Sequence, residues 1–130
     1  MHKPVEVLLD RVSERGAYAD QDEATRAVRS VLSVLGSHLV GDDRTDLATL
    51  LPPQCVPWLT ESPPASEPLT PTGFVEAVAE RDIADPLEAR RAVAAVLSAL
   101  AEMTDEALLR RILTQLPPGH AALFGRMDPD

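Results

Sequence analysis

The sequence predicts an all-α fold: a helical bundle made of two tandem pseudo-symmetric repeats of three to four helices each. Three observations support this prediction. Ala, Leu and Val dominate the 45% of residues that are hydrophobic, and aromatic residues make up only 3%, a composition that favours helices over sheet. Hydrophobic residues recur at spacings of three and four, the period of an amphipathic helix. The same order of helix signals also occurs twice along the 130 residues.

Proline, glycine and capping residues mark where the first helices begin and end. The first helix is expected to begin at Pro4 and to end at Gly16. Asp20 is expected to cap the second helix, with Glu23 three residues later as in a capping box. A single apolar stripe then follows the long helix, formed by Ala24, Ala27, Val28, Val31, Leu32, Leu35 and Leu39.

A third helix is expected to run from Gly41 to Leu51, because the two prolines that follow cannot continue it. A short apolar turn with Trp58 and Leu59 comes next. The segment TESPPASEPLTPT then holds four prolines among Ser, Thr and Glu, which predicts a semi-rigid, extended linker. The predicted organisation is a first repeat at 1–60, a Pro-rich linker at 61–72, a second repeat at 73–126 packed on the first, and a tail at 127–130.

The second half of the chain repeats the first half in nearly one register. A shift of 66 positions aligns Val12, Glu14 and Arg15 with Val78, Glu80 and Arg81. A shift of 65 positions aligns the long helices, in which Asp20, Glu23, Ala24, Arg26, Ala27, Val28, Val31, Leu32, Ser33 and Leu35 fall on Asp85, Glu88, Ala89, Arg91, Ala92, Val93, Val96, Leu97, Ser98 and Leu100. The ends align too, with Thr49, Leu51, Pro52, Pro53, Trp58 and Leu59 on Thr114, Leu116, Pro117, Pro118, Leu123 and Phe124. A unit of about 50 residues is marginal alone, so we expect the two units to share one core.

Three motifs in each copy support a family resemblance. They are a V-x-E-R first helix, a long helix of the form E-A-x-R-A-V-x-x-V-L-x-x-L, and a helix that ends in L-P-P, at the residues just aligned. Their order resembles a bacterial family catalogued as domain of unknown function 2267, over nearly the whole chain outside the termini and the linker. Members look like paired helical repeats, so the resemblance implies this fold. It implies no activity, cofactor or catalytic residue.

The charge and the cysteine content exclude several classes of protein. Acidic residues outnumber basic ones 21 to 12 and give a net charge of -9, which repels phosphate backbones and anionic lipid surfaces. We therefore expect no nucleic-acid partner and no membrane partner. Cys55 is the single cysteine, so no disulfide can form within the chain. The N-terminal residues lack the apolar stretch of a signal peptide, and no apolar run is long enough to span a bilayer, so a cytoplasmic location is expected.

Few polar residues carry a pattern that indicates chemistry. The Glu and Arg residues shared by both copies could form an acid-binding site, but capping and intrahelical pairing explain them more simply. His2, His38 and His120 have no ligand-like spacing with one another or with Cys55, so a partly buried core histidine and an inert, half-buried thiol are expected. No catalytic, cofactor-binding or metal-binding residue is predicted.

The sequence thus favours a non-enzymatic module for protein interaction or self-association. Stacked helix pairs commonly serve as binding surfaces, and the apolar ends of the two repeats supply the candidate interaction residues Trp58, Leu59, Leu123 and Phe124. Exposure is expected for Trp58 and Phe124. Two alternatives stay open: a small-molecule-binding regulatory protein that uses a cavity between the repeats, and an enzyme of unrecognised type.

Overall fold

The chain is helical throughout its described parts. The computed structural model describes residues 5–39, 41–61, 70–83, 85–116 and 119–124, and within these ranges every regular element is a helix. The predicted all-α class is therefore confirmed. Residues 62–69 of the predicted linker at 61–72, the double proline at 117–118 and the predicted tail lie outside the described residues.

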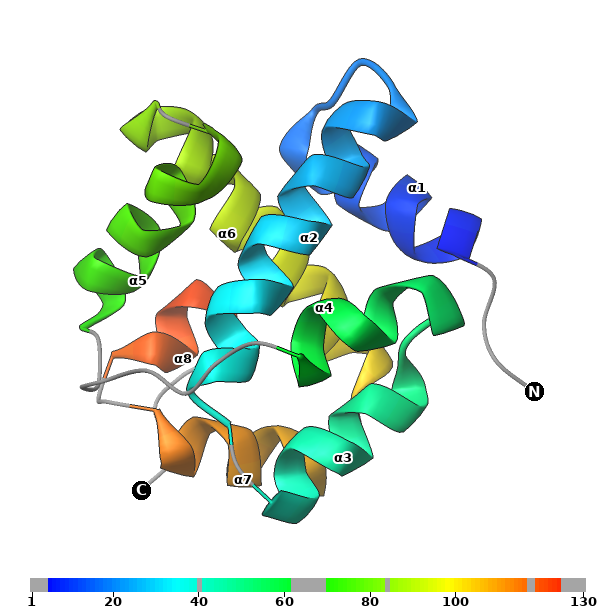
Figure 1. The fold of residues 1–130 in the computed structure, drawn as a ribbon, viewed down its shortest axis with the longest axis vertical. Helices are drawn as coiled ribbons and strands as arrows, with labels where there is room; N and C mark the ends of the chain where they lie inside the picture. The colour runs from blue at the N-terminus through cyan, green and yellow to red at the C-terminus, as the bar shows by residue number, and fades with distance from the viewer. Residues whose placement is uncertain (1–4, 40, 62–69, 84, 117–118, 125–130) are drawn as a thin grey trace.

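The helices follow one another in the order that the prolines, glycines and capping residues predict (Figure 1). The first half of the chain consists of α1 (Val5–Gly16), α2 (Gln21–Ser37), α3 (Gly41–Leu50), the 3₁₀ turn η1 (Pro53–Cys55) and α4 (Val56–Thr60). The second half consists of α5 (Pro71–Val78), the π-helical segment η2 (Ala79–Ile83), α6 (Pro86–Met103), α7 (Glu106–Gln115) and α8 (His120–Leu123).

Side-chain caps fix the starts of the long helices. The Asp20 carboxylate accepts a hydrogen bond from the backbone N–H of Glu23 at 2.9 Å, as the capping-box pattern predicts. The Glu23 carboxylate in turn accepts from the backbone N–H of Ala19 at 3.1 Å, one residue before the usual partner. At the start of α6 the Asp85 carboxylate accepts from the N–H of Leu87 at 2.9 Å. Both predicted cap residues thus act as caps.

The start of α5 differs from the prediction. The hydroxyl oxygen of Thr70 accepts a hydrogen bond from the backbone N–H of Gly73 at 3.0 Å, and Pro71 occupies the first turn. The helix therefore begins at Pro71, two residues before the expected start of the second repeat at residue 73. The composition of residues 70–72 resembles that of a linker, but Thr70 caps the helix and Pro71 lies in its first turn.

A left-handed residue ends α1. Ala17 has a φ of 56°, and the backbone N–H of Tyr18 donates to the carbonyl of Ser13 at 3.0 Å, which closes the last turn. The end of the helix at Gly16 agrees with the prediction. Gly16 gives room to the Tyr18 ring, because a Cβ at residue 16 would overlap that ring.

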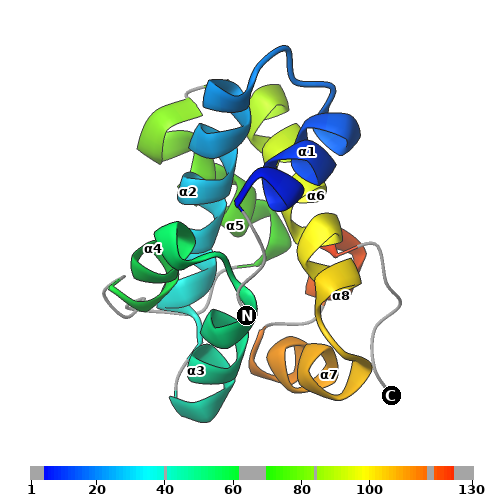
Figure 2. The ribbon, with the colours of Figure 1, turned by 90° about the vertical axis from the view of Figure 1, so that its right-hand side faces the viewer.

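Two long helices form the centre of the molecule. α2 and α6 cross in contact with each other, and α1 and α5 with η2 each pack against both of them (Figure 1). α3 and α7 lie side by side at the lower end of the molecule in Figure 2. One apolar core runs through both halves of the chain.

The predicted stripe of α2 is confirmed as core. All seven of its residues are at most 1% exposed, and the six aligned apolar residues of α6, from Ala89 to Leu100, are at most 2% exposed. Further residues outside the two stripes are also buried, namely Val34 and Gly36 on α2 and Ala95 and Ala99 on α6. Each central helix is therefore covered by neighbours over most of its circumference.

The short helix α4 approaches α2 at a glycine. A Cβ at Gly36 would overlap the carbonyl oxygen of Leu59, so this position requires the absence of a side chain. Leu59 is completely buried at this contact.

The buried stripe gives a direct test of the core. Val96→Asp is expected to lower the free energy of unfolding by about 4 kcal/mol or more, or to prevent folding, because it places an unpaired carboxylate at a fully buried position. Val31→Asp on α2 is expected to have the same effect. Thermal and urea denaturation followed by circular dichroism measure the change.

The matched control is Ala94→Asp, which introduces the same charge at an exposed position of the same helix. Its cost is expected to stay under about 1 kcal/mol, which is the range of helix propensity. A native melting temperature for Val96→Asp would show that the stripe does not form the core.

Candidate functional site

A groove opens on the surface where α5, α6 and α8 meet. Its volume is about 340 Å³, which lies within the range of sites that hold a small ligand or an inserted side chain of a partner. Its lining consists of Pro71, Thr72, Val75 and Glu76 from α5, Pro86 and Arg90 from α6, and Leu123 from α8.

Helical spacing brings these side chains together. Pro71 and Val75 are four residues apart on α5, as are Thr72 and Glu76, so each pair shares one face of that helix. Pro86 and Arg90 have the same spacing on α6. The Thr70 and Asp85 caps fix where these two helices begin, and they thereby place the first turns of both helices at the groove.

The groove combines apolar walls with two charged side chains that have no partner among the described residues. Glu76 and Arg90 are both exposed, and neither side chain makes a hydrogen bond or an ion pair with a described residue. The neighbouring Arg91 differs, since it pairs with Glu88 and its guanidinium lies 5.3 Å from the centre of the Tyr18 ring. The groove thus presents one anion and one cation that are available to a ligand.

An exposed leucine lies next to the groove in the sequence. Leu87 follows Pro86 in the first turn of α6, and 73% of it is exposed. Leu87 and Val7 are the large hydrophobic residues that the described part of the chain leaves exposed.

The structure separates the four predicted interaction residues. Leu123 is half-buried and lines the groove, and Trp58 on α4 is half-buried outside it. Leu59 and Phe124 are buried in the core, with exposures of 0% and 2%. The expectation that Phe124 is exposed is therefore wrong, because its side chain belongs to the apolar core. The interaction role of Trp58 and Leu123 stays a prediction.

The groove residues of α5 and α6 were not identified from the sequence. Pro71 and Thr72 were assigned to the linker, and Arg90 and Glu76 have no counterpart in the repeat motifs. The available signal was the spacing of four between Pro71 and Val75 just after a threonine that can cap a helix.

The repeated Glu and Arg residues take structural roles. Arg91 and Glu88 form an ion pair at a spacing of three residues within α6. Arg15 pairs with Glu102 of α6, and Arg11 binds the same carboxylate at 2.9 Å. Arg15 therefore joins α1 to α6, whereas Arg91 and Glu88 pair within α6.

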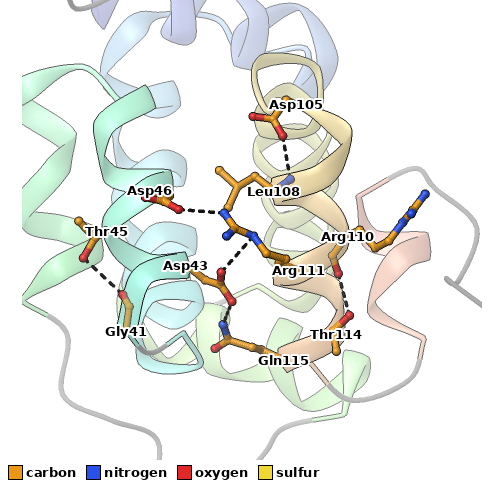
Figure 3. Close-up of polar contacts among 10 residues, drawn as sticks. All are labelled: Gly41, Asp43, Thr45, Asp46, Asp105, Leu108, Arg110, Arg111, Thr114 and Gln115. Carbon is orange, nitrogen blue, oxygen red and sulfur yellow. Dashed lines mark hydrogen bonds and ion pairs between the residues drawn. The ribbon is translucent and has the colours of Figure 1, made fainter.

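A second polar cluster joins α3 to α7 (Figure 3). The Arg111 guanidinium lies 3.3 Å from Asp43 and 2.8 Å from Asp46, and the Gln115 amide donates to Asp43. The hydrogen bond to Asp46 raises the pKa of Arg111 above its usual value. Asp105 caps α7 by accepting from the N–H of Leu108 at 2.8 Å. The cluster acts as a bridge between two helices.

Three rings pack between α2, α5 and α8. His38 is the C-terminal cap of α2, and the centre of its ring lies 6.1 Å from the centre of the Phe74 ring. The Phe74 ring contacts the His120 ring edge-on, with 5.6 Å between the ring centres. His38 is half-buried and His120 is 1% exposed. Both agree with the expectation of core histidines. Among the described residues, no group of three His, Cys, Asp or Glu side chains could hold a metal ion.

The thiol of Cys55 lies in the core. The residue is completely buried, deeper than the half-buried position expected from the sequence, and burial raises the pKa of its thiol to about 11. A thiol with this pKa is neutral and unreactive near pH 7, as the sequence suggested.

A comparison with family models identifies the chain. The model described as "Uncharacterized conserved protein (DUF2267)" matches residues 6–123. The chain belongs to the DUF2267 family. The resemblance inferred from the repeated motifs is thereby confirmed, and every residue that lines the groove lies within the matched region.

Two further results concern this DUF2267 chain. No curated protein matched it. In the described parts of the chain, none of the helices combines the length and the apolar character that crossing a bilayer requires.

The buried thiol predicts how stability depends on pH. Because the pKa of Cys55 rises from 9.0 in the exposed state to about 11 in the fold, the unfolded chain loses this proton at lower pH than the folded chain. The contribution is fully present below pH 9 and decreases as the pH rises towards 11, by at most about 1.4 kcal/mol per pH unit. Urea denaturation at a series of pH values from 8 to 11 measures it.

Cys55→Ala is the control for this titration. It is expected to be less stable at pH 8 because it leaves a cavity, but to lose less stability between pH 9 and pH 11. Tyr18, whose pKa burial also raises, titrates in both proteins and cancels in the comparison. Equal losses in the two proteins would contradict a role for the thiol.

Proposed function

We propose that this DUF2267 protein is a non-enzymatic interaction module that binds a protein partner through the groove between α5, α6 and α8. The observation that carries the proposal is the groove itself. Its walls are apolar, and its two charged side chains have no partner among the described residues. An apolar centre with charges at its edge has the composition of a protein-binding surface.

The net charge supports the type of partner. A chain with a net charge of -9 is repelled by nucleic acids and by anionic membranes, so a protein is the partner that its electrostatics favour. A cytoplasmic location remains part of this proposal, as does the absence of a cofactor.

The small-molecule alternative is less well supported. The expected cavity was one between the repeats, whereas the groove is lined only by residues from the second half of the chain. Its volume of about 340 Å³ is close to the lower end for ligand pockets, which span roughly 300 to 1,000 Å³.

We also propose that the two halves are pseudo-symmetric repeats related by an approximate twofold axis. The bounds of α3, 41–50, and of α7, 106–115, differ by 65 residues at both ends, as the sequence alignment requires. α1 and α5 are equivalent helices in this alignment, and each contacts both α2 and α6, which is consistent with a twofold axis that exchanges the two central helices.

The helices nearest the proposed axis support it further. α2 contacts its equivalent α6, and α3 contacts its equivalent α7. At the second contact Asp46 binds Arg111, and these two residues occupy equivalent positions 65 residues apart. Contact between equivalent positions is a property of an isologous interface.

Charge reversal in the groove tests the proposed function. The wild-type protein and Arg90→Glu are immobilised in equal amounts, and the proteins retained from native cytosol are quantified. We expect a defined partner that the wild type retains and that Arg90→Glu loses by about tenfold or more, because the groove then presents two anions.

Arg110→Glu is the matched control. It makes the same change of charge at an exposed position of α7, and Figure 3 shows the Arg110 side chain extending away from the Asp43 and Asp46 cluster. It should retain the partner like the wild type. Retention of nothing by the wild type, or equal loss in both variants, would argue against the groove as a binding surface.

A further inference from the structure

We infer that the groove accepts an amphipathic helix of a partner protein, which inserts an apolar side chain between α5 and α6 and places a basic residue at Glu76 and an acidic residue at Arg90. This inference rests on the proposed function and specifies the chemistry of the partner.

The walls of the groove favour a helical occupant. Pairs of residues with a spacing of four line it on α5 and on α6, and α8 contributes Leu123. A channel between two helices accepts the side chains that another helix presents at spacings of three and four. About 340 Å³ provides space for one or two large apolar side chains rather than for a long apolar segment.

The groove lacks the structural features that the other common modes of peptide recognition require. Strand addition requires an open sheet edge, and the described residues contain no strand. Recognition of a polyproline helix uses grooves with aromatic walls, whereas this lining has no aromatic residue. The helical mode is the one whose requirements the groove meets.

The two charges define the flanks of the partner helix. Glu76 belongs to α5 and Arg90 to α6, so a helix between them meets an anion on one flank and a cation on the other. Neither side chain has a partner within the described residues that would compete. A helix with an apolar face, a basic flank and an acidic flank is complementary to this arrangement.

A second copy of this chain cannot provide such a helix from its described parts. The apolar stripes of α2 and α6 are buried, and Val7 and Leu87 are the large hydrophobic residues left exposed in the described ranges. Two copies, each with a net charge of -9, also repel each other. The described parts of the chain therefore favour a different protein as the occupant.

Binding of designed peptides tests this inference on the intact protein. The probe is a fluorescein-labelled helical peptide of about 18 residues, long enough for several turns, with Leu along one face, Lys on one flank and Glu on the other. Fluorescence anisotropy should show saturable binding. The same peptide with Ser in place of Leu should not bind, and neither should an extended proline-rich peptide with the same Leu, Lys and Glu content.

Charge variants of the protein locate the binding site. Glu76→Lys should weaken binding of the probe by about tenfold, which corresponds to about 1.4 kcal/mol. A second helical peptide with Glu on both flanks should bind Glu76→Lys more tightly than it binds the wild type. Glu14→Lys makes the same change of charge at an exposed position of α1 and should leave binding of both peptides unchanged.

The outcomes separate this inference from the proposed function. If the cytosolic partner depends on Arg90 but the helical probe does not bind, the helical mode is wrong and the interaction function stands. Preference for the proline-rich peptide leads to the same conclusion. Equal weakening by Glu76→Lys and Glu14→Lys shows attraction to the whole charge rather than to the groove, and it overturns the inference.

Discussion

The burial of α2 and α6 is the constraint on which the rest of the structure depends. Each of these helices is apolar over most of its circumference, so contact between the two cannot cover either one. α1 and α5 pack on both of them, α4 packs on α2, and α8 packs on α6. Burial of a Leu or Val side chain contributes about 1.5 to 3 kcal/mol, so the two stripes supply the largest favourable term in folding. The short helices are held mainly by the central helices that they cover.

Polar contacts between the halves align the helices more than they stabilise them. Glu102 forms ion pairs with Arg11 and Arg15 of α1, and Arg111 of α7 forms ion pairs with two aspartates of α3. These side chains are 18 to 51% exposed, and ion pairs that solvent reaches contribute little to stability because water and salt screen them. Their value lies in specificity, since helices coated with Ala, Leu and Val can slide or rotate against one another at small cost.

Local signals were sufficient to predict the helices, and tertiary contacts explain what could not be predicted. Asp20, Asp85 and the α2 stripe act within a few turns of chain, so their roles can be inferred from spacing alone. Trp58 and Leu59 are adjacent residues with large side chains, yet only Leu59 is fully buried, because α4 meets α2 at Gly36. The groove needed the fold itself, since its lining extends from Pro71 to Leu123 and depends on how three helices meet.

The contact between Asp46 and Arg111 also constrains how copies of the chain can associate. In the proposed two-unit architecture these residues are equivalents, so pairing two first units through α3 would place aspartate against aspartate, and pairing two second units through α7 would place arginine against arginine. Opposite charges meet only when a first unit faces a second unit. The opposite charges of residues 46 and 111 therefore favour pairing of a first unit with a second unit and disfavour pairing of two identical units.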